Sequence, residues 1–214
     1  MRASLHALLF CGLSVVIAGC ASIGGVGKSD PAAKLQDATD LFERRDRPQL
    51  AEKLIRESIG SYESAHNELG LANAYRTYGF FFRSASVEGH WSEHYLKHGF
   101  LDESATFDGR YEKSIEYLEK ARTIFTDYER FDALTTVNLN IGFTYEVMGY
   151  WDAACEAFDR SAQSNQDSQQ ISRARVALPQ GFATYEEFLA PHRQRAGCEE
   201  WRKHPRRERT FDTA

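Results

Sequence analysis

The chain has 214 residues, of which 42% are hydrophobic and 13% aromatic, and its formal net charge is −5. This length and apolar content suit one domain of ordinary size with a substantial core. The acidic balance argues against nucleic acid as the main partner, because nucleic-acid-binding domains present a basic surface.

Residues 1–19 have the pattern of an export signal. Arg2 supplies a short positive region, and residues 7–17 are almost wholly apolar. Residues 17–20 (IAGC) then resemble the lipobox of bacterial lipoproteins. The resemblance implies removal of residues 1–19 and attachment of fatty acyl chains such as palmitate to Cys20. Because Ala21 follows instead of Asp, it also implies an anchor in the outer membrane with the protein facing the periplasm. The alternative is an ordinary buried thiol at Cys20.

Residues 20–31 would then comprise the lipidated cysteine and a flexible tether. Residues 24–29 resemble the end of a phosphate-binding P-loop, but that pattern would begin at Ser22 instead of a glycine. Asp30 and Pro31 also interrupt the chain where a P-loop helix should start. We therefore expect a Gly/Ser-rich tether and no bound cofactor.

Helical periodicity begins at Lys34 and predicts two helices before residue 64. Residues 46–48 predict the turn between them, since proline is favourable at a helix start. The two apolar stripes are Leu35, Ala38, Thr39 and Phe42, followed by Ala51, Ile55 and Ser58.

Residues 68–81 and 138–151 share a pattern of small and aromatic residues, and the second copy lies 70 residues after the first. The equivalent pairs are Leu71 and Ile141, Ala72 and Gly142, Tyr75 and Tyr145, Gly79 and Gly149, and Phe81 and Trp151. After the second copy, Ala154 and Phe158 continue the pattern on another expected helix. Small residues at such positions allow two helices to approach closely.

The pattern of residues 138–162 resembles the tetratricopeptide repeat (TPR), a helix–turn–helix unit of about 34 residues. The resemblance implies an all-α superhelix of about three helix pairs in residues 32–198. The repeats fall at about 32–64, 65–128 and 135–168, with a short segment at 128–133 before the third. An insertion at about 83–108 splits the second repeat, because the pattern stops after Phe81 and resumes at residues 109–111.

Residues 169–198 are expected to cap the array. Residues 178–182 break any helix, and Thr184 then begins another that Pro191 limits in length. A terminal helix of this kind would cover the apolar face of the last repeat. Residues 199–214 form a polar tail, whose basic side chains are either solvated or in contact with anionic headgroups or peptidoglycan.

Cys155 and Cys198 remain as a pair if Cys20 is acylated. A disulfide between them would fasten the cap to the last repeat, and the periplasm permits it. Two reduced thiols in the core remain the alternative, because sequence does not show proximity.

His90, His94 and His98 lie in the insertion at i, i+4 and i+8, along one face of an expected helix. Zinc needs three or four ligands that converge on a point, whereas i and i+8 are about 12 Å apart along a helix. A metal or pH-sensing site is therefore the weaker reading. In the other reading the histidines are solvated and the insertion packs through Trp91, Leu96 and Phe100.

No arrangement of Ser, His and Asp indicates an enzyme. The TPR resemblance implies instead a groove, lined by the first helices of successive repeats, that binds a peptide or helix of a protein partner. The groove positions are Gln36, Asp40, Glu43, Leu69, Asn73, Arg76, Leu139, Phe143 and Glu146. We predict a lipid-anchored adaptor in envelope, pilus, secretion or cell-wall assembly, with its groove complete in the monomer or in a homodimer. The alternative is a lipoprotein that binds a metal or small ligand through the insertion.

Overall fold

The computed structural model describes residues 30–172 and 177–199. Within these ranges the chain is all-helical and contains no strand, as the periodicity predicts. The expected signal peptide, Cys20, the rest of the tether up to residue 29, and the tail from residue 200 lie outside the described residues. None of the helices described has the length and apolar character needed to cross a bilayer.

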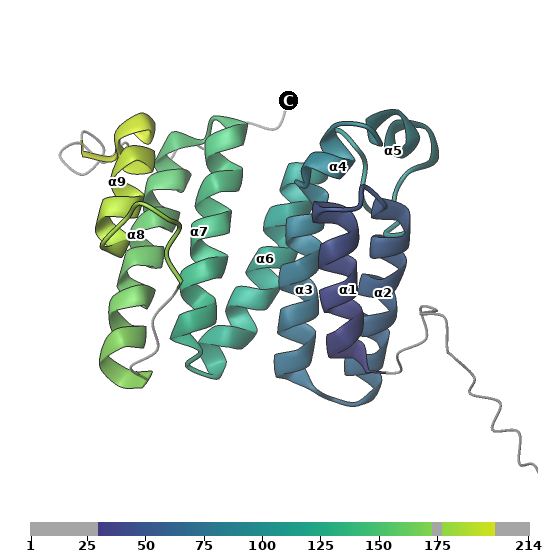
Figure 1. Ribbon diagram of the computed structural model, residues 1–214, viewed down its shortest axis with the longest axis horizontal. Coiled ribbons are helices and arrows are strands. Elements are labelled where there is room, and N and C mark those ends of the chain that lie inside the picture. Colours follow the sequence, from purple (N-terminus) through teal and green to yellow (C-terminus); the bar gives the residue numbers. More distant parts are fainter. Residues whose placement is uncertain (1–29, 173–176, 200–214) are drawn as a thin grey trace, which may run out of the picture.

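The long helices pack as antiparallel pairs that follow one another along the molecule in chain order (Figure 1). The pairs are α1 (Pro31–Glu43) with α2 (Pro48–Ser64), α3 (Glu68–Phe82) with α6 (Arg110–Asp127), and α7 (Phe131–Met148) with α8 (Trp151–Asp167). Neighbouring pairs also pack together, through α2 on α3 and α6 on α7. The core is therefore continuous along the array.

Two helix starts differ from the sequence-based boundaries. The Asp30 side chain accepts a hydrogen bond from the Ala32 N–H at 3.0 Å, and Pro31 occupies the first turn, so α1 begins in the segment assigned to the tether. Similarly, α7 begins at Phe131, inside the segment 128–133 that was expected to precede the third repeat. In both places local capping or turn geometry starts the helix about one turn before the residues at which the apolar periodicity predicted it to begin.

Glycine brings the two helices of a pair close together at two positions. A Cβ atom on Gly142 would lie 2.5 Å from the Phe158 ring, and one on Gly79 would lie 2.7 Å from Cγ of Leu118. Both distances are too short for a real contact, so a side chain would force α7 from α8 and α3 from α6. Gly79 and Gly142 therefore have a packing role, whereas Gly149, the pattern equivalent of Gly79, ends α7 with a φ of 76° and a Cβ there would meet no atom within 4 Å.

The insertion between α3 and α6 contains two short helices, α4 (Ala85–Glu88) and α5 (Ser92–His98). Tyr95 and Phe100 are buried and stack on each other, with ring centroids 4.4 Å apart. They lie against Phe81 and Phe82 of α3. The prediction that Leu96 packs inward is wrong, since its side chain is 58% exposed. Tyr95 takes the inward position, and the next residue lies about 100° further round the helix.

The C-terminal part packs on α8. A π-helical turn, η1 (Ser168–Ser172), follows α8, and α9 (Tyr185–Ala196) lies along its outer side (Figure 1). The Thr184 hydroxyl accepts a hydrogen bond from the Glu187 N–H at 3.1 Å and caps α9. Pro191 does not end α9, because buried Leu189 and Ala196 hold the helix on either side of it.

A disulfide joins Cys155 of α8 to Cys198, just beyond α9. The two Cα atoms are 5.3 Å apart, and 43 residues separate the cysteines in the sequence. Both residues are fully buried. The bond therefore holds the end of α9 against the last helix pair, within the apolar cluster that Phe158, Tyr185 and Leu189 also form.

Candidate functional site

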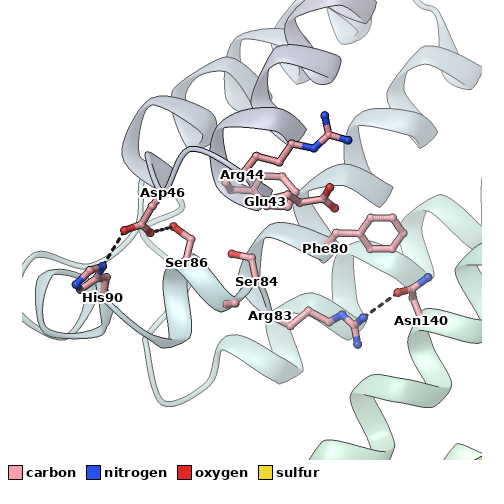
Figure 2. Close-up of a pocket in the computed structure, with 11 residues that line it drawn as sticks. Glu43, Arg44, Asp46, Phe80, Arg83, Ser84, Ser86, His90 and Asn140 are labelled. Atoms are coloured by element: carbon pink, nitrogen blue, oxygen red, sulfur yellow. Dashed lines mark hydrogen bonds and ion pairs between the residues drawn. The ribbon is translucent and has the colours of Figure 1, made fainter.

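A cavity of about 550 Å³ lies where the C-terminal ends of α1 and α3 meet α4 and the middle of α7 (Figure 2). Its lining includes Phe42 and Glu43 of α1, Phe80 of α3, Arg83 directly after α3, and Asn140 of α7. The first helix of each of the three pairs thus reaches the same cavity. Pro31, the first residue of α1, is at the other end of that helix from the cavity.

The turn between α1 and α2 is joined to the insertion at one wall of the cavity. Ser86 donates a hydrogen bond to Asp46 Oδ1 at 2.6 Å, and Nδ1 of His90 lies 3.0 Å from Asp46 Oδ2 (Figure 2). Trp91 Nε1 donates to the Asp46 carbonyl at 3.0 Å. The Ser86 hydrogen bond is the main cause that holds the pKa of the Asp46 carboxyl below its usual value. The carboxylate stands between the serine and the histidine, so His90 does not activate the Ser86 hydroxyl.

Arg83 connects the second and third helix pairs across the cavity. Its Nη2 donates a 2.9 Å hydrogen bond to Asn140 Oδ1, and its guanidinium carbon lies 5.9 Å from the centroid of the Phe143 ring. Figure 2 shows the side chain extending from the end of α3 toward Asn140 of α7. Burial is the main cause that lowers the pKa of Arg83 from its ordinary value. The cavity therefore contains a partly desolvated positive charge.

Among the groove residues predicted on α1 and α3, only Glu43 lines the cavity. Asp40 forms an ion pair with Arg45, at 2.5 Å, and Gln36 is exposed. On α3, Leu69 is half-buried and its carbonyl accepts a hydrogen bond from Asn73 at 2.8 Å.

Arg76 lies over the Phe125 ring, with its guanidinium carbon 5.7 Å from the ring centroid, and donates a hydrogen bond to Asn73 at 2.9 Å. It shares a face of α3 with Phe80 and Arg83, which follow at i+4 and i+7. Arg76 is nearer the start of α3 and does not line the cavity.

The groove residues predicted at the end of α7 are engaged by α9. Glu146 forms an ion pair with Arg195, its carboxylate lies 3.4 Å from His192 Nδ1, and its side chain is only 12% exposed. The Phe143 ring packs against the His192 ring with centroids 4.6 Å apart. Leu139 packs against the apolar cluster that contains Phe158, Tyr185 and Leu189. The prediction that these side chains stand open in a groove needs correction here, because the capping helix folds back over this part of α7.

The three histidines of the insertion do not share one helix. α5 begins at Ser92, so His90 precedes it and contacts Asp46 instead. The His94 and His98 rings lie 4.8 Å apart, and His94 is also within hydrogen-bond distance of Gln49. In the described part of the chain, no group of three or more His, Cys, Asp and Glu side chains is arranged to hold a metal ion.

Sequence reasoning missed Phe80, Arg83 and Asn140. Phe80 and Arg83 could have been found by continuing the α3 face from Arg76 at i+4 and i+7, but the repeat pattern stops there because the insertion begins. Asn140 has no distinguishing signal, since it is one of several polar residues on α7. The hydrogen bond between Arg83 and Asn140 joins positions that are 57 residues apart in the sequence.

No protein-family model, curated protein or solved structure matches this chain. The functional conclusion therefore depends on the geometry of the chain itself.

Proposed function

We propose that this protein is a lipid-anchored adaptor with a TPR-like array, which binds a segment of a partner protein in the cavity at α1, α3 and α7. One observation carries the proposal: the first helices of three successive helix pairs contribute to a single cavity. In helical-repeat arrays, the equivalent helices form the surface that binds a partner.

The packing of the pairs supports the TPR-like reading. Gly79 and Gly142 occupy equivalent helices, each where the paired helix comes too close for a side chain. The insertion interrupts only the connection within the second pair, because α3 and α6 still pack together. Insertions of this kind, added to a loop on one side of an array, often contribute to its binding face.

The cavity lining suits a polypeptide segment. Phe42 and Phe80 offer apolar surface, while Glu43, Arg83 and Asn140 offer charged and amide groups of different kinds. Such a mixture can hold the backbone and alternate side chains of an extended segment or a short helix. The lining therefore supports a binding function for this protein.

The position of the proposed anchor fits this role. Cys20 precedes α1, whose first residue, Pro31, is at the far end of that helix from Phe42 and Glu43. A helix of this length spans about 20 Å. In Figure 1 the start of α1 is at the lower edge of the array, whereas α4 and α5 are at the upper edge. A lipid on Cys20 would therefore be attached through the end of α1 that lies farther from the cavity.

The Cys155–Cys198 disulfide supports a periplasmic location, because such bonds persist in oxidising compartments. We propose that the protein is held on the periplasmic side of the outer membrane. There it would bring a partner to an envelope, pilus, secretion or cell-wall assembly.

Site-specific photo-crosslinking tests the proposal. A photoreactive benzoylphenylalanine would replace Glu43 or Asn140 in the full chain, expressed in the cells that make it. The control position is Lys53, which is exposed on α2 and does not line the cavity. We expect one defined protein to be captured from both cavity positions and not from Lys53. Capture of no protein above the Lys53 background would overturn the proposed function.

A further inference from the structure

Arg83 carries a positive charge without a direct carboxylate partner among the described residues. Its hydrogen-bond acceptor is the neutral amide oxygen of Asn140, at 2.9 Å. Glu88 favours its charged form only from beyond ion-pair distance. Of the two carboxylates in the cavity lining, Asp46 is already bound by Ser86 and His90, and Glu43 is not within ion-pair distance of Arg83.

The lack of a direct carboxylate partner is energetically unfavourable for a guanidinium that has lost part of its hydration. Burial lowers the pKa of Arg83, so the charged form is less well solvated here than at the surface. A guanidinium has several N–H donors in a planar fork, and Asn140 uses one of them. The group that best satisfies the rest is a carboxylate, which accepts two parallel hydrogen bonds.

The surroundings hold Arg83 ready for such a ligand. Asn140 fixes the guanidinium from one side, and the Phe143 ring lies 5.9 Å from its central carbon. An arginine fixed in this way loses little side-chain entropy when it binds a planar acid. Because Arg83 lines the cavity, an incoming group can reach it there (Figure 2).

We infer that the partner segment bound in the cavity carries an Asp or Glu side chain whose carboxylate pairs with Arg83. This inference depends on the proposed function, since it specifies the chemistry of the segment that the cavity binds. Asn140 then acts as a positioning residue that keeps the guanidinium directed across the cavity.

A peptide-display selection tests the inference. A random twelve-residue library, fused through its C-terminal end to a phage coat protein, has no free peptide carboxyl terminus, so side chains supply the carboxylates. The target is the full-length protein in mild detergent. We expect the selected peptides to share an Asp or Glu. Replacement of that residue by Asn or Gln should weaken binding at least about tenfold, as measured by fluorescence anisotropy.

Variants then locate the contact. Arg83→Gln should weaken binding of the acidic peptide by a similar factor. It should not weaken further the binding of the peptide in which Asn or Gln replaces the acidic residue. Arg83→Lys keeps the charge but loses the fork, so we expect an intermediate loss. Arg56→Gln is the matched control, because Arg56 is exposed on α2 and does not line the cavity. Its binding should equal that of the unmodified protein.

Asn140→Asp separates loss of binding from loss of folding. The new carboxylate would take the place of the amide that already accepts from Arg83, and would pair with it internally. We expect this variant to remain folded, with an unchanged circular dichroism spectrum, and yet to bind the acidic peptide at least about tenfold more weakly.

Selected peptides without an acidic residue, or acidic peptides insensitive to Arg83→Gln and Asn140→Asp, would overturn the inference and leave the proposed function standing. If the library yields no binding peptide, the inference and the proposed function both fail. An acidic peptide whose binding follows the expected pattern in all four variants supports both.

Discussion

The hydroxyl of Tyr78 donates a 2.7 Å hydrogen bond to the buried carboxyl group of Glu52. The same oxygen of Glu52 accepts a hydrogen bond from the Leu101 N–H at 2.8 Å, so α2, α3 and the insertion meet at one polar group. Burial is the dominant effect and raises the pKa of Glu52 from 4.5 to about 7. The folded protein therefore holds a carboxyl group that is neutral in mild acid.

This pKa predicts that stability decreases as the pH rises. Below pH 4.5 the carboxyl is protonated in both states, whereas between pH 4.5 and about 7 it ionises only in the unfolded chain. Ionisation then favours unfolding, by an amount that levels off above pH 7 at about 3 kcal/mol. Glu52→Gln should flatten the dependence of the free energy of unfolding on pH between 5 and 8, as measured by urea denaturation.

The control for Glu52→Gln is Glu112→Gln, since Glu112 is exposed at the start of α6. Its pH dependence should follow that of the unmodified protein. If Glu52→Gln also retains the full slope, Glu52 does not titrate as its burial requires.

Gly142→Ala should destabilise the last helix pair. The added Cβ would lie 2.5 Å from the Phe158 ring, and overpacking of this kind costs about 1–3 kcal/mol. Gly60→Ala is the matched control in α2, where a Cβ would meet no atom within 4 Å. Alanine is the better helix former there, so this change should stabilise by about 0.5–1 kcal/mol. Urea denaturation measures both; equal effects in the same direction would contradict the close approach of α7 and α8.

Loss of the disulfide should release α9 before the rest of the array. The bond closes a loop of 43 residues, for which the chain-entropy model gives about 4 kcal/mol at most. We expect Cys198→Ser to lower the melting temperature and to speed amide hydrogen exchange in α9. Dithiothreitol should lower the melting temperature of the unmodified protein and leave that of the variant unchanged. Unchanged exchange in α9 after Cys198→Ser would show that apolar packing alone holds this helix.

The lipid anchor predicts a simple labelling result. Cells fed a clickable palmitate analogue should label the unmodified protein, and Cys20→Ala should abolish both the label and recovery with the membrane fraction. Cys155→Ala is the control, because Cys155 is buried and disulfide-bonded and should not accept a fatty acid. Persistent labelling of the Cys20→Ala protein would exclude the lipobox assignment.

The repeated pattern predicted much of the helical order because helix periodicity is local. Stripes such as Leu35, Ala38 and Phe42 face inward in α1, and all three are buried. The pattern also located Gly79 and Gly142, where only a small residue permits the observed approach of two helices. Helix ends were less certain, because the Asp30 cap and the packing around Pro191 depend on contacts outside the periodic stripe.

The candidate site was predictable only in part. Glu43 follows from its place on α1, but Phe143 and Glu146 are taken up by α9, whose path over α7 leaves no mark in the periodicity. The insertion obeys no repeat pattern. Its contact with the first helix pair, through His90 and Asp46, could not be inferred from sequence spacing.

By itself, the sequence predicted that residues 32–198 would be mainly helical, with apolar stripes and small residues where helices approach closely. These properties arise from side chains three or four positions apart, which share a helix face. Only the tertiary structure decided that Arg83 would meet Asn140, and that Cys155 would join Cys198. Such pairs lie on different helices, so their proximity depends on how whole helices pack, and this packing is what assembles the cavity.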